Sequence, residues 1–303
     1  MERQLSNTID AALQVIADAV RDVDGSKRWS VHLLIDPTLA DPLSLLEAEG
    51  RERVRVSISR TLMSEAHCPY LVPVREVGRD PLIDAALDRA MCEVEGNSSV
   101  PPGARSVCAF IASRVSAIEI ARSLARRAAV SSGGERRLFR FWDPRVMDLL
   151  PQFISFDEIR NLVAPVERWC WIARDGRAEV LELADASPAS GPHRPLDPGR
   201  FMNFGRINKV IDSLNLDSAS YRKIDCAKID RDIRAGERRW RLQTEYEMVS
   251  YALHRHLVGD HFDDDDEVRH LMESAVQKGD SPIVALESLS EQFWASFSGR
   301  QGL

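Results

Sequence analysis

The sequence predicts an α+β or α/β protein, with an N-terminal mixed-sheet domain followed by an all-helical lobe. Strand-like and helix-like segments alternate through the first 183 residues, which is typical of folds that layer helices on a sheet. Residues 184–199 are rich in Pro, Ser, Ala and Gly and predict a linker. Nearly every segment beyond this linker has helical spacing. We therefore expect an α/β domain over residues 1–183 and a helical lobe over residues 200–303.

The predicted strands are short and are bounded by turn-forming residues. Hydrophobic alternation or an apolar run marks each one. Asp175-Gly176 separates two apolar segments and predicts a hairpin that closes the first domain on a mixed sheet. The expected strands are residues 31–35, 54–58, 70–74, 107–111, 138–142, 167–173 and 177–183.

The predicted helices are identified by apolar spacing and by their capping residues. Ser116 with Glu119, and Ser155 with Glu158, have the spacing of a capping box. Residues 131–135 are expected to form a loop. The expected helices are residues 2–22, 42–49, 81–94, 116–130 and 155–163 in the first domain, then 203–216, 225–257 with a break near Gly236, 263–278 and 281–297.

Composition and charge argue against several classes of partner. The 303 residues include 40 basic and 47 acidic side chains, and the net charge of −7 disfavours a nucleic acid or an anionic membrane as partner. Residues 1–10 lack an apolar signal core, and the longest apolar runs are too short to cross a bilayer. The five scattered cysteines contain no CxxC pair and are expected to be reduced thiols. We expect a cytoplasmic protein.

One stretch, residues 138–151, combines a predicted strand, a turn and a helix start. Its aromatic residues favour a strand, while Asp143 can cap a helix whose first position is Pro144. Arg140 and Arg145 flank Asp143, and both are expected to reach its carboxylate. We interpret this motif as a structural corner between a strand and a helix. Its residues are Phe139, Arg140, Phe141, Trp142, Asp143, Pro144 and Arg145.

This motif, followed by an apolar helix that ends at Leu150-Pro151, resembles the signature of type VI secretion effector adaptors. These proteins, also called effector chaperones, load a toxin onto the VgrG spike protein. Three further segments resemble the same family: residues 33–36, residues 69–72, and residues 164–166 with Trp169. The resemblance covers roughly residues 30 to 175. The family usually carries a His-Leu-Arg run before the motif, where this chain has Ser123, Leu124, Ala125 and Arg126.

The resemblance implies a non-catalytic adaptor chaperone with two protein partners and no cofactor. One partner would be a cognate effector, and the other would be the VgrG spike. Two lobes joined by a linker could form a cleft for a partner segment such as a helix. An immunity protein that blocks a toxin is an alternative, because it also binds an effector but would not bind VgrG.

Two groups in the predicted helical lobe are candidate partner-binding residues. Arginines surround Trp240 but alternate with acidic residues, so this stretch is either a solvated, salt-bridged face or a docking face with Trp240 as its anchor. The aromatic group near residue 294 is either docked core or a second partner site. The candidate residues are Arg238, Trp240, Arg241 and Trp294.

A cluster of His and Asp residues between His254 and Asp266 raises a third possibility, a metal-dependent hydrolase. Its spacing matches no familiar metal site. A helix end followed by an acidic helix start explains the same residues, because carboxylates favour a helix N-terminus. The sequence contains no P-loop, dinucleotide fingerprint or GxSxG motif. We therefore expect no metal, no cofactor and no catalytic residues.

Overall fold

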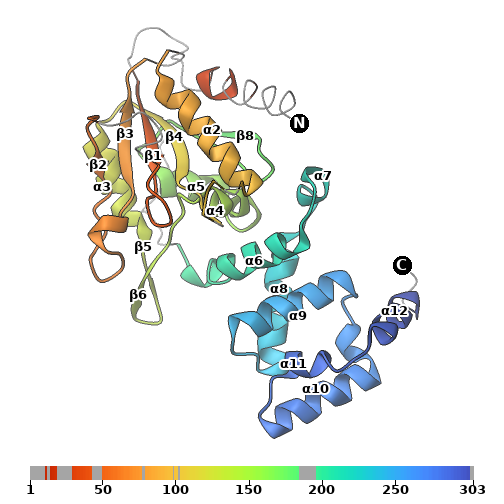
Figure 1. Cartoon of the computed structure of the whole chain (residues 1–303). Helices are drawn as coiled ribbons and strands as arrows, with labels where there is room; N and C mark the ends of the chain where they lie inside the picture. Colours follow the sequence, from red (N-terminus) through yellow and green to blue (C-terminus); the bar gives the residue numbers. More distant parts are fainter. Residues whose placement is uncertain are drawn as a thin grey trace. The chain divides into compact units, whose positions relative to one another are not determined.

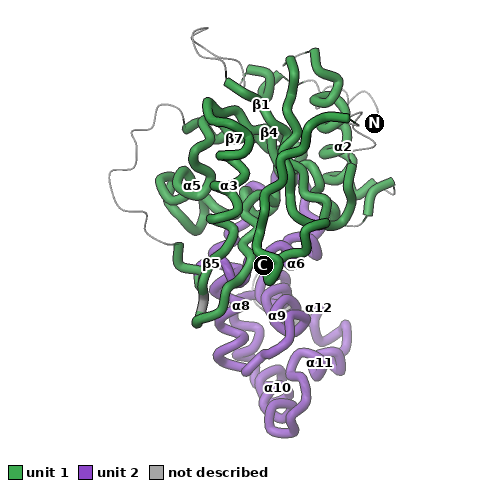
Figure 2. The backbone as a smooth tube through the Cα atoms, turned by 90° about the vertical axis from the view of Figure 1, so that its left-hand side faces the viewer, with its two compact units in different colours: residues 1–199 green, residues 200–303 purple. Residues whose placement is uncertain are grey.

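The computed structural model describes residues 11, 14–18, 29–42, 50–76, 79–97, 99–101, 103–183 and 196–300. The chain divides into two compact units, residues 1–199 and residues 200–303 (Figure 2). Residues 184–195 of the predicted linker lie outside the described residues, as do residues 43–49 of one predicted helix. Of the predicted N-terminal helix, residues 14–18 are described and are helical.

The first unit is built on a six-stranded sheet with the order β2-β3-β1-β4-β7-β8. Every pairing between its described strands is antiparallel, and the α+β class is confirmed. The sheet is antiparallel rather than mixed, because the helix Pro81–Glu95 connects β3 and β4, which run in the same direction but lie on either side of β1. The strands are β1 (Ser30–Ile35), β2 (Val54–Arg55), β3 (Tyr70–Val74), β4 (Val107–Ser113), β7 (Arg168–Ile172) and β8 (Ala178–Glu182).

Helices cover both faces of this sheet. Figures 1 and 2 show α2 (Pro81–Glu95) on one face, and α3 (Ala117–Ala128) with α5 (Phe156–Val163) on the other. Side chains alternate along β1, so Leu33 packs in the cluster that includes α2, while its neighbour Leu34 faces the opposite side. Both side chains are fully buried. Because both faces of the sheet are covered, both sets of alternating side chains are apolar, and the strand segments are almost continuous apolar runs.

Local signals place the ends of these elements as expected. Asp80 caps α2 through the N–H of Leu82, and Gly96 ends the helix in the left-handed region with φ 66°. Ser116 and Ser155 each form a complete capping box at the start of α3 and α5. The predicted hairpin at Asp175-Gly176 forms between β7 and β8.

The predicted strand over residues 138–142 is wrong. A separate hairpin forms instead, from β5 (Ala129–Ser132) and β6 (Glu135–Leu138), and its turn is Gly133-Gly134 with positive φ at both glycines. Residues 139–142 lie outside the strand, although the N–H of Phe139 still donates to the carbonyl of Ala128 at 2.7 Å, and their aromatic side chains are buried. The predicted strand over residues 54–58 also shortens to β2, although Val56 and Ile58 remain buried.

After this corner, the chain forms α4 (Pro144–Leu149) and a 3₁₀ turn, η2 (Leu150–Gln152). A further 3₁₀ turn, η1 (Glu65–His67), precedes β3. None of the helices among the described residues has the length and apolar character needed to cross a bilayer.

The second unit is helical, and it differs from the prediction in where its helices break. The segment predicted as one helix over residues 225–257 is two helices, and the break lies at residues 241–244 rather than at Gly236. Arg241 ends the first of them in the left-handed region with φ 54°. The elements are η3 (Pro198–Arg200), α6 (Phe204–Leu214), α7 (Ser218–Tyr221), α8 (Cys226–Trp240), α9 (Glu245–Leu257), η4 (Phe262–Asp264), α10 (Asp266–Lys278), α11 (Pro282–Leu286) and α12 (Glu291–Arg300).

Candidate functional site

The motif of residues 139–145 forms a corner that leads from β6 into α4. Asp143 caps α4 by accepting a hydrogen bond from the N–H of Arg145 at 3.0 Å. The Arg145 guanidinium returns to the same carboxylate, with Nε–Oδ1 at 3.0 Å and Nη2–Oδ2 at 2.7 Å. Burial raises the pKa of Asp143, but the hydrogen bonds and charge of Arg145 outweigh it, so the pKa lies below its ordinary value.

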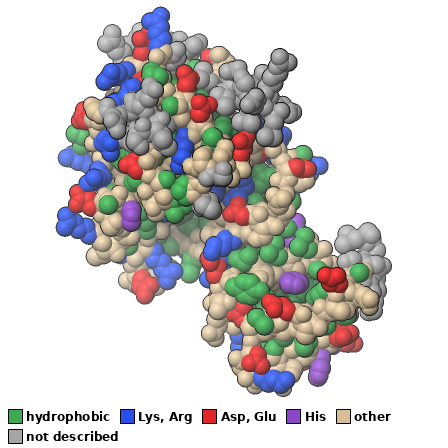
Figure 3. Space-filling view, viewed as in Figure 1, with side chains coloured by type: hydrophobic (Ala, Val, Ile, Leu, Met, Phe, Trp, Pro, Cys, Tyr) green, Lys and Arg blue, Asp and Glu red, His purple; other side chains and the backbone are tan. Residues whose placement is uncertain are grey.

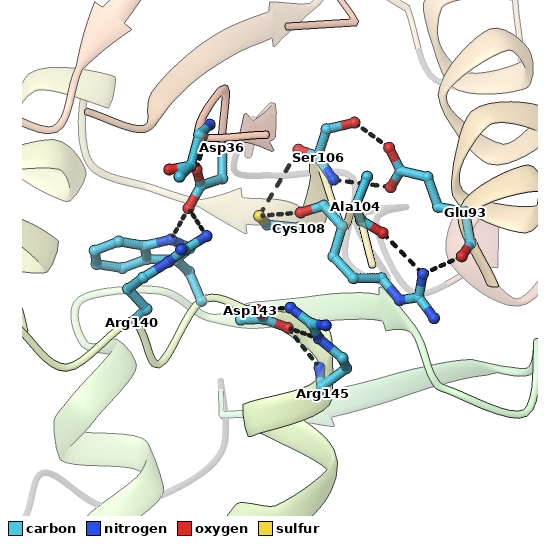
Figure 4. A network of polar contacts seen from close by, with 11 residues as sticks. Asp36, Glu93, Ala104, Ser106, Cys108, Arg140, Asp143 and Arg145 are labelled. Atoms are coloured by element: carbon cyan, nitrogen blue, oxygen red, sulfur yellow. Dashed lines mark hydrogen bonds and ion pairs between the residues drawn. The ribbon is translucent and has the colours of Figure 1, made fainter. Parts of the chain in front are cut away.

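Asp36, just beyond the end of β1, holds the motif against the sheet. Its Oδ2 accepts hydrogen bonds from Trp142 Nε1 at 2.7 Å and from Arg140 Nη2 at 2.8 Å (Figure 4). Its Oδ1 accepts the backbone N–H and the hydroxyl of Thr38. The Asp36 carboxylate is buried and receives four donors. It therefore fixes the position of the motif relative to β1.

The expectation that both arginines reach Asp143 is half right. Arg145 forms the ion pair with Asp143, whereas Arg140 pairs with Asp36 instead. The nearby Arg140 charge still lowers the pKa of Asp143. The two arginines diverge because Asp36 lies across from the turn, a long-range juxtaposition that the local spacing does not reveal.

A second buried polar group continues this network toward α2. Glu93 accepts hydrogen bonds from the backbone N–H of Ser106 at 2.8 Å and from Arg89 Nε at 2.8 Å. Arg105 donates to the carbonyl oxygens of Glu93 and Ala104 (Figure 4). These hydrogen bonds join the segment that precedes β4 to α2.

The arrangement of these groups suits positioning rather than covalent chemistry. Cys108 lies beside the network but is buried, and burial together with Asp36 and Asp143 raises the pKa of its thiol well above the ordinary value. The thiol is therefore protonated at neutral pH and is a poor nucleophile. The motif aromatics are buried, while the side chains of Arg140 and Arg145 are 33% and 21% exposed.

The interpretation of Trp240 as a surface anchor is wrong. Trp240 is 5% exposed, and its indole N–H donates to Asp263 Oδ2 at 2.7 Å inside the second unit. Tyr251 donates to the same oxygen at 2.7 Å, and Arg239 Nη1 lies 3.2 Å from it. A buried carboxylate with several donors holds the indole in the core, so its ring is not available to a partner.

The other candidate residues of the second unit occupy different environments. Arg238 and Arg241 are exposed near the end of α8. Trp294 of α12 is half-buried and packs on His254, with ring centroids 5.5 Å apart, and on Phe262 at 6.5 Å. The structure thus joins Trp294 to the adjoining aromatic cluster and leaves the two arginines at the surface.

The histidines and aspartates between residues 254 and 266 have separate roles. His254 contacts the carbonyl of Ser250 and stacks on Phe262, whereas His261 pairs with Asp264 at 2.9 Å. Asp265 caps α10. Across the ranges that the structure describes, no three His, Cys, Asp or Glu side chains converge in a way that could hold a metal ion.

One surface feature that the sequence did not reveal is a groove of about 1120 Å³ in the first unit. It lies between residues 54–59 and α3, and its lining includes Arg122, Arg126 and Arg136. The sequence does show several arginines along α3. The net negative charge of the whole chain gives no indication of this local positive charge.

Comparison with known families gives one match. A family model described as a domain of unknown function, DUF4123, matches residues 34–159, less than half of the chain. This domain is known to occur in effector adaptor proteins of type VI secretion systems. The matched segment starts in β1 and includes both Asp36 and the motif corner. A search of curated proteins and a search of solved structures returned no significant match.

Proposed function

We propose that this chain is a non-catalytic adaptor chaperone that binds a cognate type VI secretion effector and delivers it to the VgrG spike. The observation that carries this proposal is the DUF4123 match, since that domain occurs in type VI effector adaptors. The motif resemblance described above lies within the matched segment. Such an adaptor would act in the cytoplasm, before secretion.

The chemistry of the motif corner supports a binding role. Asp36 and Asp143 are both committed to hydrogen bonds and ion pairs with their neighbours. The buried thiol of Cys108 is protonated at neutral pH. These groups stabilise a corner of the fold, so a partner would be held by non-covalent contacts on the surfaces that this corner positions.

The division of the chain into two compact units also supports a protein with two partners. Each unit has its own buried core and its own buried carboxylate network, centred on Asp36 in the first and on Asp263 in the second. Separate bodies allow one unit to hold the effector while the other contacts the spike.

Co-purification tests the proposal. The tagged full-length chain is expressed together with the proteins encoded beside it, including any VgrG, and the complexes are recovered on the tag. We expect a neighbouring toxin and VgrG to be recovered together. The tag alone, expressed with the same proteins, is the control for non-specific recovery.

Other outcomes would overturn the adaptor proposal. Recovery of the toxin alone with its activity blocked, together with protection of a susceptible cell that lacks the secretion machinery, would identify an immunity protein. Recovery of neither protein, with stoichiometric metal in the purified chain and a hydrolytic activity lost in His256→Ala, would identify a metal-dependent hydrolase.

A further inference from the structure

The groove in the first unit runs along the β2 edge of the sheet. β2 is the terminal strand in the sheet order and pairs only with β3 among the described strands. α3 lies beside this edge, and the β5–β6 hairpin contributes Ser131 and Arg136 to the lining (Figure 1). The groove therefore combines a strand edge with a helix that carries positive charge.

Among the described residues, the backbone at this edge is paired on its inner side only. Val56 donates its N–H to the carbonyl of Pro69 at 2.8 Å, on the inner side of the strand. Because backbone groups alternate in direction along an extended segment, we infer that the N–H and C=O groups of Arg55, the last residue of β2, point toward the outer edge, and that those of Ser57, two residues further on, do the same. Arg55, Ser57 and Ser59 line the groove, whereas Val56 and Ile58 are buried. An extended segment of another chain could therefore form backbone hydrogen bonds with this edge.

The charge of the groove is strongly positive in an otherwise acidic chain. Arg122, Arg126 and Arg136 are exposed, and none of them lies within 4.0 Å of a carboxylate among the residues that the structure describes. Glu119 is the acidic residue of the lining, and its carboxylate is engaged in the capping box with Ser116. Figure 3 shows several Lys and Arg side chains along the side of the first unit where Figure 1 draws β2 and α3.

The lining favours a peptide over a nucleic acid. Proteins that bind single-stranded nucleic acid stack bases on aromatic side chains, and the lining of this groove has none. It instead contains the exposed apolar side chain of Ile118, which is 51% exposed, beside the strand edge. A strand edge, an apolar contact and positive charge together match an extended segment with acidic and apolar residues.

We propose that an extended peptide segment rich in Asp and Glu binds in this groove as an added strand along β2, with its carboxylates on Arg122, Arg126 and Arg136. The backbone of the segment would pair with the outward groups of Arg55 and Ser57. This inference rests on the adaptor proposal, because it assigns the groove to an acidic segment of one of the two partner proteins.

Fluorescence anisotropy with the full-length chain tests the groove directly. The probe is a fluorescein-labelled peptide of about twelve residues in which Glu alternates with Val or Thr. We expect binding that weakens at higher salt, and a loss of affinity of about tenfold or more in the variant Arg122→Glu/Arg126→Glu/Arg136→Glu. The matched control, Arg79→Glu/Arg137→Glu/Arg231→Glu, makes the same charge change at exposed positions outside the groove and should bind as the wild type does.

A second probe tests strand pairing without changing the protein. A peptide of the same sequence with alternate backbone nitrogens methylated keeps its charge but loses the donors needed to pair with β2. We expect it to bind at least about tenfold more weakly than the unmethylated peptide. Equal binding of the two peptides, or equal binding by the two triple variants, would overturn the inference. Tighter binding of a single-stranded RNA oligonucleotide, lost in the groove variant, would overturn it in favour of a nucleic acid.

Co-purification separates the failure of this inference from the failure of the adaptor proposal. If the wild type recovers toxin and VgrG and the groove variant recovers both equally well, the groove assignment is wrong and the adaptor proposal stands. If the wild type recovers neither partner, the adaptor proposal is wrong, and with it the assignment of the groove to an adaptor's partner.

Discussion

At the scale of single residues, buried or partly buried carboxylates that accept indole N–H groups recur through the described residues. Each of these contacts joins segments distant in sequence and satisfies a tryptophan nitrogen that burial would otherwise leave without a partner. Asp36 and Asp263 also pair with a guanidinium, from Arg140 and Arg239 respectively. The pairs are Asp36 with Trp142, Asp148 with Trp171, and Asp263 with Trp240.

The substitution Asp36→Asn should destabilise the first unit by about 2–4 kcal/mol. Donors approach both oxygens of Asp36, so the amide NH₂ of Asn would face donors in either orientation. Denaturant unfolding followed by tryptophan fluorescence measures the change. Asp157→Asn, which removes an exposed carboxylate paired with Arg160, should change the free energy of unfolding by less than about 1 kcal/mol. Similar losses in the two variants would contradict the role of Asp36.

Asp143 should make stability depend on pH in the acidic range. Its pKa is lowered in the folded state, so its contribution is complete above the unfolded-state pKa, about 3.9, and is lost as pH falls through the lower folded-state value. Asp143→Asn keeps a cap acceptor but cannot titrate. The difference in free energy of unfolding between wild type and variant should be constant above about pH 5 and shrink below about pH 4. Denaturant unfolding curves of both proteins, recorded on both sides of this pH range, measure the difference in free energy of unfolding. A difference that grows on acidification would contradict this account.

At the scale of elements, local signals predicted helix ends better than strand ends. The capping boxes at Ser116 and Ser155 and the turn at Asp175-Gly176 depend on neighbouring residues, so the sequence identifies them. The end of β6 depends instead on the two-residue turn at Gly133-Gly134, a Gly-Gly hairpin signal inside the residues 131–135 that are predicted as a loop. The aromatic run after it has strand propensity, but the burial of its side chains, rather than strand pairing, determines its conformation.

Gly236 illustrates a second limit of reading elements from sequence. A glycine inside a helical pattern suggests a break, yet α8 continues through it. A Cβ placed there would lie 2.6 Å from Tyr251 Cδ1 and 2.9 Å from Leu242 Cδ1. The glycine therefore allows close packing of α8 with α9, which only the tertiary structure reveals.

Gly236→Ala should destabilise the second unit by about 1–3 kcal/mol, because the added methyl group overlaps the packed Tyr251 ring. Gly205→Ala is the matched control, since Gly205 is also helical and a Cβ there meets nothing within 4 Å. The control should be neutral or stabilising by up to about 1 kcal/mol. Thermal and denaturant unfolding measure the stability of both variants. Equal changes in the free energy of unfolding would show that packing at Gly236 tolerates an added methyl group.

At the scale of the whole molecule, the sequence identified the fold class and the family resemblance more fully than the site. The motif was correctly interpreted as a corner with Asp143 as its cap, but the partnership of Arg140 with Asp36 spans a long stretch of chain and left no local signal. Trp240 is of a residue type that is enriched in binding hot spots, yet it is buried, because Asp263 accepts the hydrogen bond of its indole N–H inside the second unit. The basic groove depends on arginines from α3 and a hairpin that only the fold brings together.

The most direct test of the adaptor account is the amount of effector carried by the spike in cells with and without this chain. VgrG is isolated from both strains, and the bound effector is quantified against total effector. We predict that the effector is synthesised in both strains but is absent from VgrG when the chain is missing, and that expression of the wild-type chain restores it. Equal loading of VgrG in both strains would contradict the account.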